Sequence, residues 1–179
     1  MTTSAESTTS VPQLSTTEYA VLGVLAPEDA HGFAIAKKLD ADAVIGRVMT
    51  VRRPLVYRAL DRLVEQGLAA PVGTEKGDSG PRRFVHRITP EGTRALEAWL
   101  STPVDHVRQL RIDFLLKVAL IESLDGSPVD LIRLQRRHLA PTLKALDEPD
   151  GADHVELWRR HIAAAASAYL TDLEARSTR

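Results

Sequence analysis

The sequence predicts a mainly α-helical protein with one small β-hairpin. Apolar residues recur at helical spacing over most of the 179 residues, and one turn-rich stretch lies between two short extended runs. Proline or glycine follows or precedes most of the helical segments. Cysteine is absent, which excludes disulfides, thiolate metal sites and a cysteine nucleophile.

The chain starts with a polar segment. Seven of the first ten residues are Ser or Thr, so residues 1–13 are expected to form a disordered tail. Ser15 and Glu18 have the spacing of a capping box, which predicts that a first helix begins at Thr16.

A second, shorter helix is expected from His31 to about Leu39. Phe33, Ala36 and Leu39 are predicted to lie on its inner face. The region around Gly46 ends this helical pattern.

A third helix is expected to begin near Pro54 and to run to Gln66, with Gly67 as its C′ residue. Its two faces differ in polarity. The inner face is apolar and contains Val56, Ala59, Leu60 and Leu63. The outer face is polar and basic and contains Leu55, Arg58, Arg62 and Glu65, with Tyr57 at its border.

Two extended runs, 68–72 and 82–88, flank the turn-rich stretch 73–81 and predict a β-hairpin. Thr89 and Pro90 form an N-cap and N1 pair that opens a fourth helix. Three helices, a hairpin and a further helix are the element order of a winged helix-turn-helix. We therefore predict such a domain over residues 14–102.

Residues 103–179 are predicted to form a helical domain for dimerisation and effector binding. Apolar spacing is helical over 107–121 and 132–146, and Pro141 is expected to kink or interrupt the second segment. A last helix carries a narrow apolar seam with steps of three and four residues, as helix interfaces use. The seam consists of Val155, Trp158, Ile162, Ala165, Tyr169 and Leu173. The candidate dimerisation residues are Phe114, Val118, Val155, Trp158, Ile162 and Tyr169.

Basic residues are concentrated in one segment. The whole chain has a net charge of −1, but the segment from Arg47 to Arg87 holds nine basic and four acidic residues, a net +5. A localised basic face is typical of nucleic-acid binding, although a solvated basic face would give the same pattern. We expect the third helix to enter the major groove of double-stranded DNA and the hairpin to follow its phosphates. The predicted DNA contacts are Arg52, Arg53, Tyr57, Arg58, Arg62, Lys76, Arg82 and Arg83.

Four segments together resemble the PadR family of transcriptional regulators. They are TEYAVLGVLAPEDAHGFAIAKKL (17–39), VYRALDRLVEQGLAA (56–70), RRFVHRITPEG (82–92) and FLLKVALIES (114–123). The resemblance implies a winged helix-turn-helix with a helical dimerisation region, and a repressor that a small molecule releases from DNA. The chain departs from the family where it reads Arg52-Arg53-Pro54-Leu55, and where His86 replaces a second wing tyrosine.

Other functions have less support from the residues. The histidines are scattered and the hairpin glycines lack the G-K-[ST] of a P-loop, so no metal, cofactor or enzymatic activity is expected. A MarR-like regulator, or a helical interaction module that has lost DNA binding, is an alternative. An aromatic or apolar effector is expected near Trp99, Phe114 and Trp158. Because neither an export signal nor a membrane span is present in the sequence, the expected location is the cytoplasm.

Overall fold

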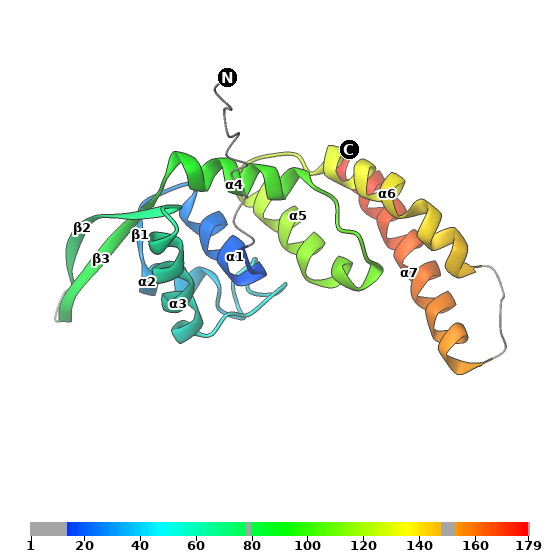
Figure 1. Ribbon diagram of the computed structural model, residues 1–179, viewed down its shortest axis with the longest axis horizontal. Coiled ribbons are helices and arrows are strands. Elements are labelled where there is room, and N and C mark those ends of the chain that lie inside the picture. Colours follow the sequence, from blue (N-terminus) through cyan, green and yellow to red (C-terminus); the bar gives the residue numbers. More distant parts are fainter. Residues whose placement is uncertain (1–13, 78–79, 148–152, 179) are drawn as a thin grey trace, which may run out of the picture.

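The elements follow the order of a winged helix-turn-helix and continue into a helical C-terminal half (Figure 1). A computed structural model describes residues 14–77, 80–147 and 153–178. The helices are α1 (Thr16–Leu25), α2 (Gly32–Lys38), α3 (Arg53–Glu65), α4 (Pro90–Ser101), the 3₁₀ helix η1 (Val107–Arg111), α5 (Asp113–Ser123), α6 (Val129–Asp147) and α7 (His154–Ser177). The strands are β1 (Ala30–His31), β2 (Ala69–Gly77) and β3 (Gly80–Ile88). This confirms the predicted fold class.

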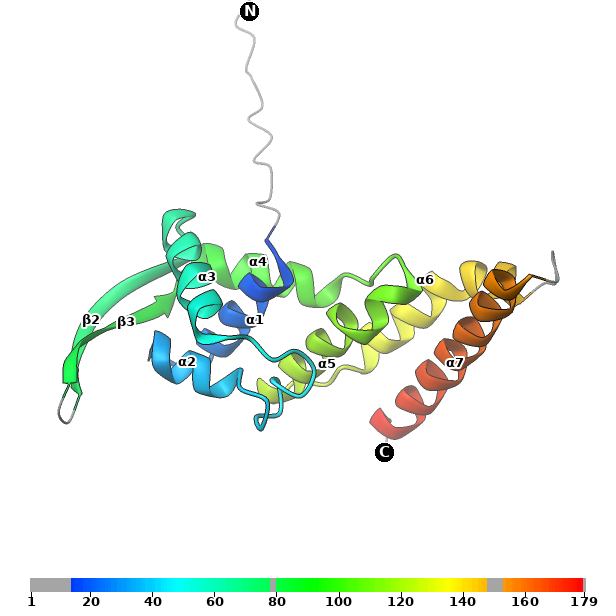
Figure 2. The ribbon, with the colours of Figure 1, turned by 90° about the horizontal axis from the view of Figure 1, so that it is seen from below.

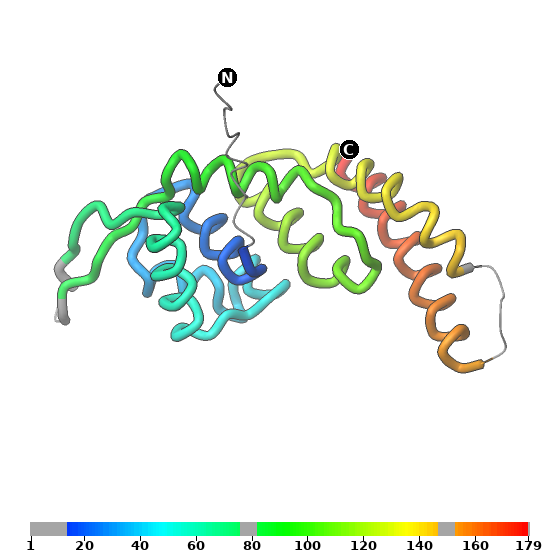
Figure 3. The backbone as a smooth tube through the Cα atoms, viewed as in Figure 1, coloured from blue at the N-terminus to red at the C-terminus, as the bar shows by residue number. Residues whose placement is uncertain are grey.

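The molecule is elongated, with the hairpin at one end and the α6–α7 pair at the other (Figures 1 and 2). Figure 3 follows the chain from β3 into α4, which leads away from the hairpin toward the C-terminal helices. The predicted tail, residues 1–13, lies outside the described residues. No helix within the described residues is both long enough and apolar enough to cross a membrane.

Helix α1 lies at the centre of the N-terminal half. It begins with the predicted capping box, in which Glu18 N donates to the Ser15 hydroxyl (3.3 Å) and Ser15 N donates to the Glu18 carboxylate (2.6 Å). Its residues from Glu18 to Leu25 are all buried, because α3, α4 and α5 pack around it. Gly23 permits the close approach of α5, since a Cβ there would lie 2.5 Å from Leu120 Cδ2.

The sheet has three antiparallel strands in the order β1-β3-β2. The short strand β1 was not predicted, because a two-residue strand carries no periodicity; Ala30 pairs with His86, and His31 pairs with Val85. Strands β2 and β3 extend beyond the predicted runs into the stretch 73–81, and their register shifts twice along the way. Such irregularities let a hairpin accommodate proline and glycine.

Helix α3 agrees closely with the predicted third helix. All four residues of its predicted inner face are buried. Gly67 has a φ of 70°, a left-handed conformation that favours glycine, and the helix ends before it as expected. Leu55 and Tyr57 remain 44% and 43% exposed, so the outer face of α3 carries apolar as well as basic surface.

The predicted inward position of Phe33 is wrong. Its side chain is 37% exposed, whereas Ile35 is fully buried and Ala36 and Leu39 are buried as expected. The inner stripe of α2 contains Gly32, Ile35 and Ala36. Phe33 lies one residue after Gly32, about 100° around the helix, and so projects from a different face.

The continuity of two helical segments differs from what their spacing indicates. The helical spacing over 107–121 is divided between η1 and α5, with Ile112 at φ −116° between them. Of the two expectations for Pro141, an interruption is wrong, because α6 continues through it. Pro141 is exposed, so water can replace the hydrogen bond that its missing N–H removes.

Two hydrophobic clusters fill the interior. The first lies within the winged helix-turn-helix and includes Leu116 and Leu120 of α5. The second lies among η1, α5, α6 and α7 and includes Phe114 and Val118. Helix α5 therefore contributes one i, i+4 pair to each cluster, on opposite faces, and joins the two halves of the chain.

Candidate nucleic-acid interface

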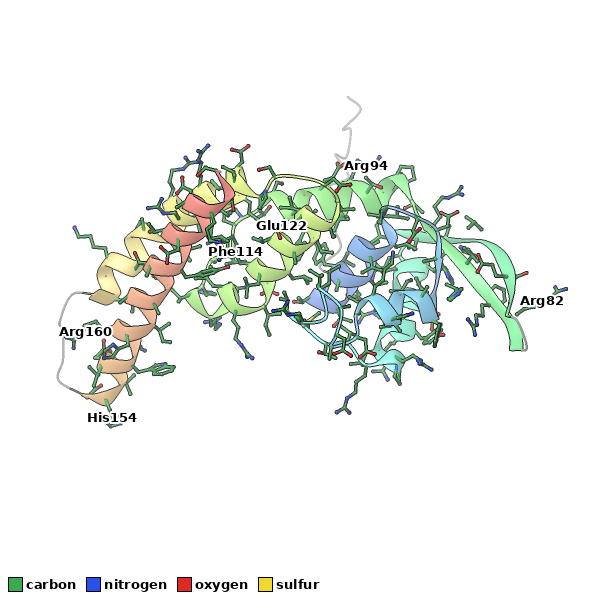
Figure 4. All side chains as sticks on the ribbon, turned by 180° about the vertical axis from the view of Figure 1, so that it is seen from behind. Arg82, Arg94, Phe114, Glu122, His154 and Arg160 are labelled. Carbon is green, nitrogen blue, oxygen red and sulfur yellow. The ribbon has the colours of Figure 1, made fainter. Side chains whose placement is uncertain are left out.

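Arginine side chains are exposed on α3 and on the outer part of the hairpin. Arg52 is the N-cap residue of α3, where no side chain caps the helix, and Arg53 and Arg58 lie in the helix. Arg82 lies in β3 near the outer end of the hairpin, as Figure 4 shows, and is followed by Arg83, whose side chain is half-buried. Among the described residues, no carboxylate lies within 4.0 Å of any of these five guanidiniums. The positive charge at this end is therefore not neutralised by ion pairs within the described chain.

Lys76, another predicted contact, lies in β2, but its side chain is outside the described part of the structure.

Arg53 and Arg83 meet at one aromatic ring. The Arg53 Cζ lies 4.7 Å from the centroid of the Phe33 ring, and the Arg83 Cζ lies 5.0 Å from the same centroid. Sequence reasoning missed this contact, because it placed Phe33 in the core. The signal that could have revealed it is the period of α2, in which Ile35 and not Phe33 continues the inner stripe.

Tyr57 lies against the start of α2. A Cβ at Gly32 would be 2.5 Å from Tyr57 Cε1, so only glycine lets the ring approach this closely. Tyr57 is 43% exposed, and its hydroxyl has no hydrogen-bond partner among the described residues. The ring thus packs on α2, and the hydroxyl forms no hydrogen bond with the part of the chain that the structure describes.

Arg62 has a different environment from the other predicted contacts. Its Nε lies 3.0 Å from Oε1 of Glu18, whose side chain is 2% exposed. A buried carboxylate is costly unless a cation or hydrogen bonds compensate it. Arg62 therefore compensates the charge of Glu18, which ties α3 to α1.

Further polar contacts lie where the hairpin meets the segment before α2. Arg87 of β3 donates two hydrogen bonds to Asp29, at 2.8 and 2.6 Å, and this guanidinium lowers the pKa of the Asp29 carboxyl. His31 Nδ1 accepts a hydrogen bond from Ala34 N at 3.0 Å and caps α2. Burial lowers the pKa of His86, and its Nδ1 has no partner among the described residues. The Arg87–Asp29 contact and the β1–β3 pairing fix the hairpin to the segment that precedes α2.

The candidate dimerisation residues fall into two groups. Phe114 is fully buried and Val118 is 6% exposed within the second cluster, and Tyr169 packs partly buried against it. Val155 and Trp158, at the start of α7, are 46% and 66% exposed, and Ile162 is half-buried. Within α7 it is Ala163, Ala166 and Leu170, outside the predicted seam, that are buried.

The three candidate effector residues do not come together in the chain. Trp99 stacks on Tyr19, with ring centroids 4.3 Å apart and 8° between the planes. Phe114 is in the second cluster, at the middle of the molecule in Figure 4, and Trp158 is exposed on α7. A groove of about 1100 Å³ lies between α6 and α7, lined by small residues of α7 and by cations of α6, and contains none of the three.

The fold and this face define the class: a winged helix-turn-helix protein with exposed arginines on its third helix and hairpin. Residues 21–98 match the family described as "Transcriptional regulator PadR-like family". The match agrees with the resemblance that the sequence segments within residues 21–98 indicated. No curated protein matches the sequence.

Several solved structures are similar to the chain. Bacillus subtilis PadR in complex with operator DNA is 18% identical with a TM-score of 0.47, over 90% of this chain and 95% of that one. The same protein with p-coumaric acid is 17% identical with a TM-score of 0.45, over 92% and 100%. A PadR family transcription regulator from Clostridium difficile R20291 is 22% identical with a TM-score of 0.41, over 63% and 100%.

Proposed function

We propose that this PadR-like regulator binds double-stranded DNA through α3 and the β2–β3 hairpin. The observation that carries the proposal is the set of exposed arginines on these two elements without carboxylate partners among the described residues. Unpaired guanidiniums bind phosphate oxygens and guanine edges, often with two hydrogen bonds each. Helix α3 is the recognition helix in this proposal, and the hairpin follows the backbone beside it.

The DNA-binding proposal is tested with duplexes selected from a random pool. The purified full-length chain should enrich one sequence, and footprinting should show protection on both halves of an inverted repeat. Half-sites should lie a whole number of turns apart, about 10 bp or a multiple. Binding to the random pool only, with no enrichment, would contradict sequence-specific recognition.

We further propose that the chain acts as a homodimer. The exposed apolar side chains at the start of α7, Val155, Leu157 and Trp158, support this, because an apolar patch of this kind is typical of an interface. Two half-sites also require two recognition helices at a fixed separation.

The dimer is tested by sedimentation of Trp158→Glu beside Trp158→Phe. Trp158→Glu should give monomers that keep the far-UV circular dichroism of the fold, since this side chain is exposed. Trp158→Phe keeps the position apolar and should remain a dimer. If Trp158→Glu sediments as a dimer, the interface lies elsewhere.

Repression with release by a small molecule completes the proposal. Helix α5 supports release by a ligand, because it packs in both hydrophobic clusters. A ligand that shifts the packing of the second cluster would therefore move a helix that also packs on the winged helix-turn-helix. A ligand would then shift the separation of the two recognition helices by binding one arrangement more tightly. Gel shifts with the selected duplex test this: an aromatic or apolar compound that releases the chain supports it, and transcription that rises when the chain is added contradicts repression.

A further inference from the structure

Phe33 is an exposed aromatic residue that touches two cations. It is excluded from both hydrophobic clusters, yet its ring receives the guanidiniums of Arg53 and Arg83 at 4.7 and 5.0 Å. These two arginines come from different elements, the first turn of α3 and strand β3. Like charges repel, so their approach to one ring needs an attractive contribution. The negative face of an aromatic ring supplies it.

The start of α2, which carries Phe33, is held to strand β3. His31, two residues earlier, caps α2 through Nδ1 and also pairs in β1 with Val85 of β3. The first turn of α2 is therefore tied to the strand that carries Arg83. The His31 and Phe33 rings lie 6.2 Å apart. Because the helix turn that carries Phe33 is fixed, the arginine side chains of Arg53 and Arg83 that pack on its ring lose conformational freedom before DNA binds.

Glu75, which lies opposite Arg83 in the hairpin, does not neutralise its charge. Glu75 is the partner of Arg83 in the β2–β3 register. Its carboxylate oxygen Oε2 lies 3.9 Å from His31 Nε2, and no carboxylate of the described residues lies within 4.0 Å of Arg83. Both guanidiniums therefore keep donors for an external anion.

We propose that Phe33 is a positioning residue for DNA binding: it holds Arg53 of the recognition helix and Arg83 of the hairpin as one pair that binds the DNA backbone phosphate. The inference rests on the proposed function and adds a residue and a mechanism to it. Arginine has a long, flexible side chain. When it becomes ordered only on association, the loss of conformational entropy weakens binding. A ring that orders both arginines in the free protein reduces the entropy that is lost when DNA binds.

The test measures duplex affinity of the full-length chain and its Phe33→Leu variant. We expect Phe33→Leu to bind about tenfold more weakly, because two side chains lose their platform. The loss should be similar on selected and random duplexes, since phosphate contacts carry no sequence information. Phe33→Tyr keeps the ring and should bind like the wild type. The control is Val44→Ala, at an apolar residue that is 71% exposed and lies outside α3 and the hairpin, which should have little effect.

A double-mutant cycle separates positioning from a merely structural role. In the Arg53→Ala/Arg83→Ala background, Phe33→Leu should change affinity by less than about twofold, because the groups that it positions are gone. A tenfold loss that persists in this background, or equal binding by wild type and Phe33→Leu, overturns the inference. So does a loss confined to the selected sequence. A wild type that binds no duplex overturns the proposed function as well, whereas the other outcomes leave it intact.

Discussion

Leu116 and Val118 lie two residues apart on α5 and belong to two different hydrophobic clusters. Leu116 is fully buried in the cluster of the winged helix-turn-helix, and Val118 is 6% exposed in the cluster of the C-terminal helices. One helix therefore serves as packing surface for both halves. Unfolding of either cluster removes support from the other, so the two should unfold together.

Leu116→Ala tests this coupling. We expect the free energy of unfolding to fall by about 2–5 kcal/mol, the usual cost of such a cavity, in a single urea transition. The exposed Leu55→Ala, at 44% exposure and outside both clusters, is the matched control and should change stability little. Two separate transitions in the wild type, with only the first affected by Leu116→Ala, would show that the clusters are independent.

Arg62→Ala distinguishes a structural from a DNA-contacting arginine. Its partner Glu18 is buried, so the substitution should lower the free energy of unfolding by about 1–3 kcal/mol, the cost of an uncompensated buried polar group. Adding Glu18→Gln should recover part of that loss. Urea titration of the two variants measures both effects. Unchanged stability of Arg62→Ala together with weaker DNA binding would show that Arg62 contacts DNA instead.

Tyr57→Phe removes a hydroxyl that has no partner among the described residues and leaves the ring on Gly32. Thermal stability should therefore be unchanged. DNA binding should weaken by the ~1 kcal/mol of one hydrogen bond. Calorimetry and gel shifts measure the two quantities, and a lower melting temperature with full affinity would mean that the hydroxyl serves the fold.

Lys117 should make stability depend on pH in the alkaline range. Its side chain is 2% exposed; Nζ donates to Thr102 O at 2.5 Å and lies 4.7 Å from the Trp99 ring centroid. Burial lowers the pKa of Lys117 from 10.5 to about 8, although Asp113 and Asp105 oppose the shift. Between these values the unfolded chain keeps the proton that the folded chain has released, so rising pH stabilises the fold.

The measurement compares the wild type with Lys117→Met, which keeps the apolar stem without the charge. From pH 8 to 10.5 the wild type should gain up to about 3 kcal/mol of unfolding free energy relative to Lys117→Met. Burial also raises the pKa values of Tyr19 and Tyr169, but both variants share these groups and their effect cancels. Parallel pH profiles would show that Lys117 is not desolvated in the fold.

Local signals in the sequence predicted much of the N-terminal fold. The capping box of α1 and the glycine that ends α3 depend on residues close in sequence, and both were found where expected. Strand β1 depends on β3, more than fifty residues away, so local spacing could not reveal it. The contact between Phe33 and Arg83 also joins distant residues, although the period of α2 already places Phe33 off the inner stripe. The same holds for Arg62, whose spacing indicated only an outer face and not the buried Glu18 beneath it.

The C-terminal half was harder to predict for a related reason. The spacing over 107–121 indicated one helix, but its apolar residues serve two clusters on opposite faces, and periodicity does not show which side a cluster lies on. In α7 the predicted seam and the buried residues occupy different positions. Small residues such as Ala163 and Ala166 allow α6 to approach, and alanines give a weak hydrophobic signal.

The most direct test of DNA binding by α3 is the salt dependence of affinity for the selected duplex, measured for wild type, Arg58→Ala and Arg94→Ala. Arg58 is exposed on α3, while Arg94 is exposed on α4 and paired with Glu91. We predict that Arg58→Ala weakens binding, and either reduces the slope of log K against log salt by about one unit or relaxes one base position by about 1–3 kcal/mol. Arg94→Ala should match the wild type. An Arg58→Ala variant with wild-type affinity, slope and base preference would contradict the assignment of α3 as the recognition helix.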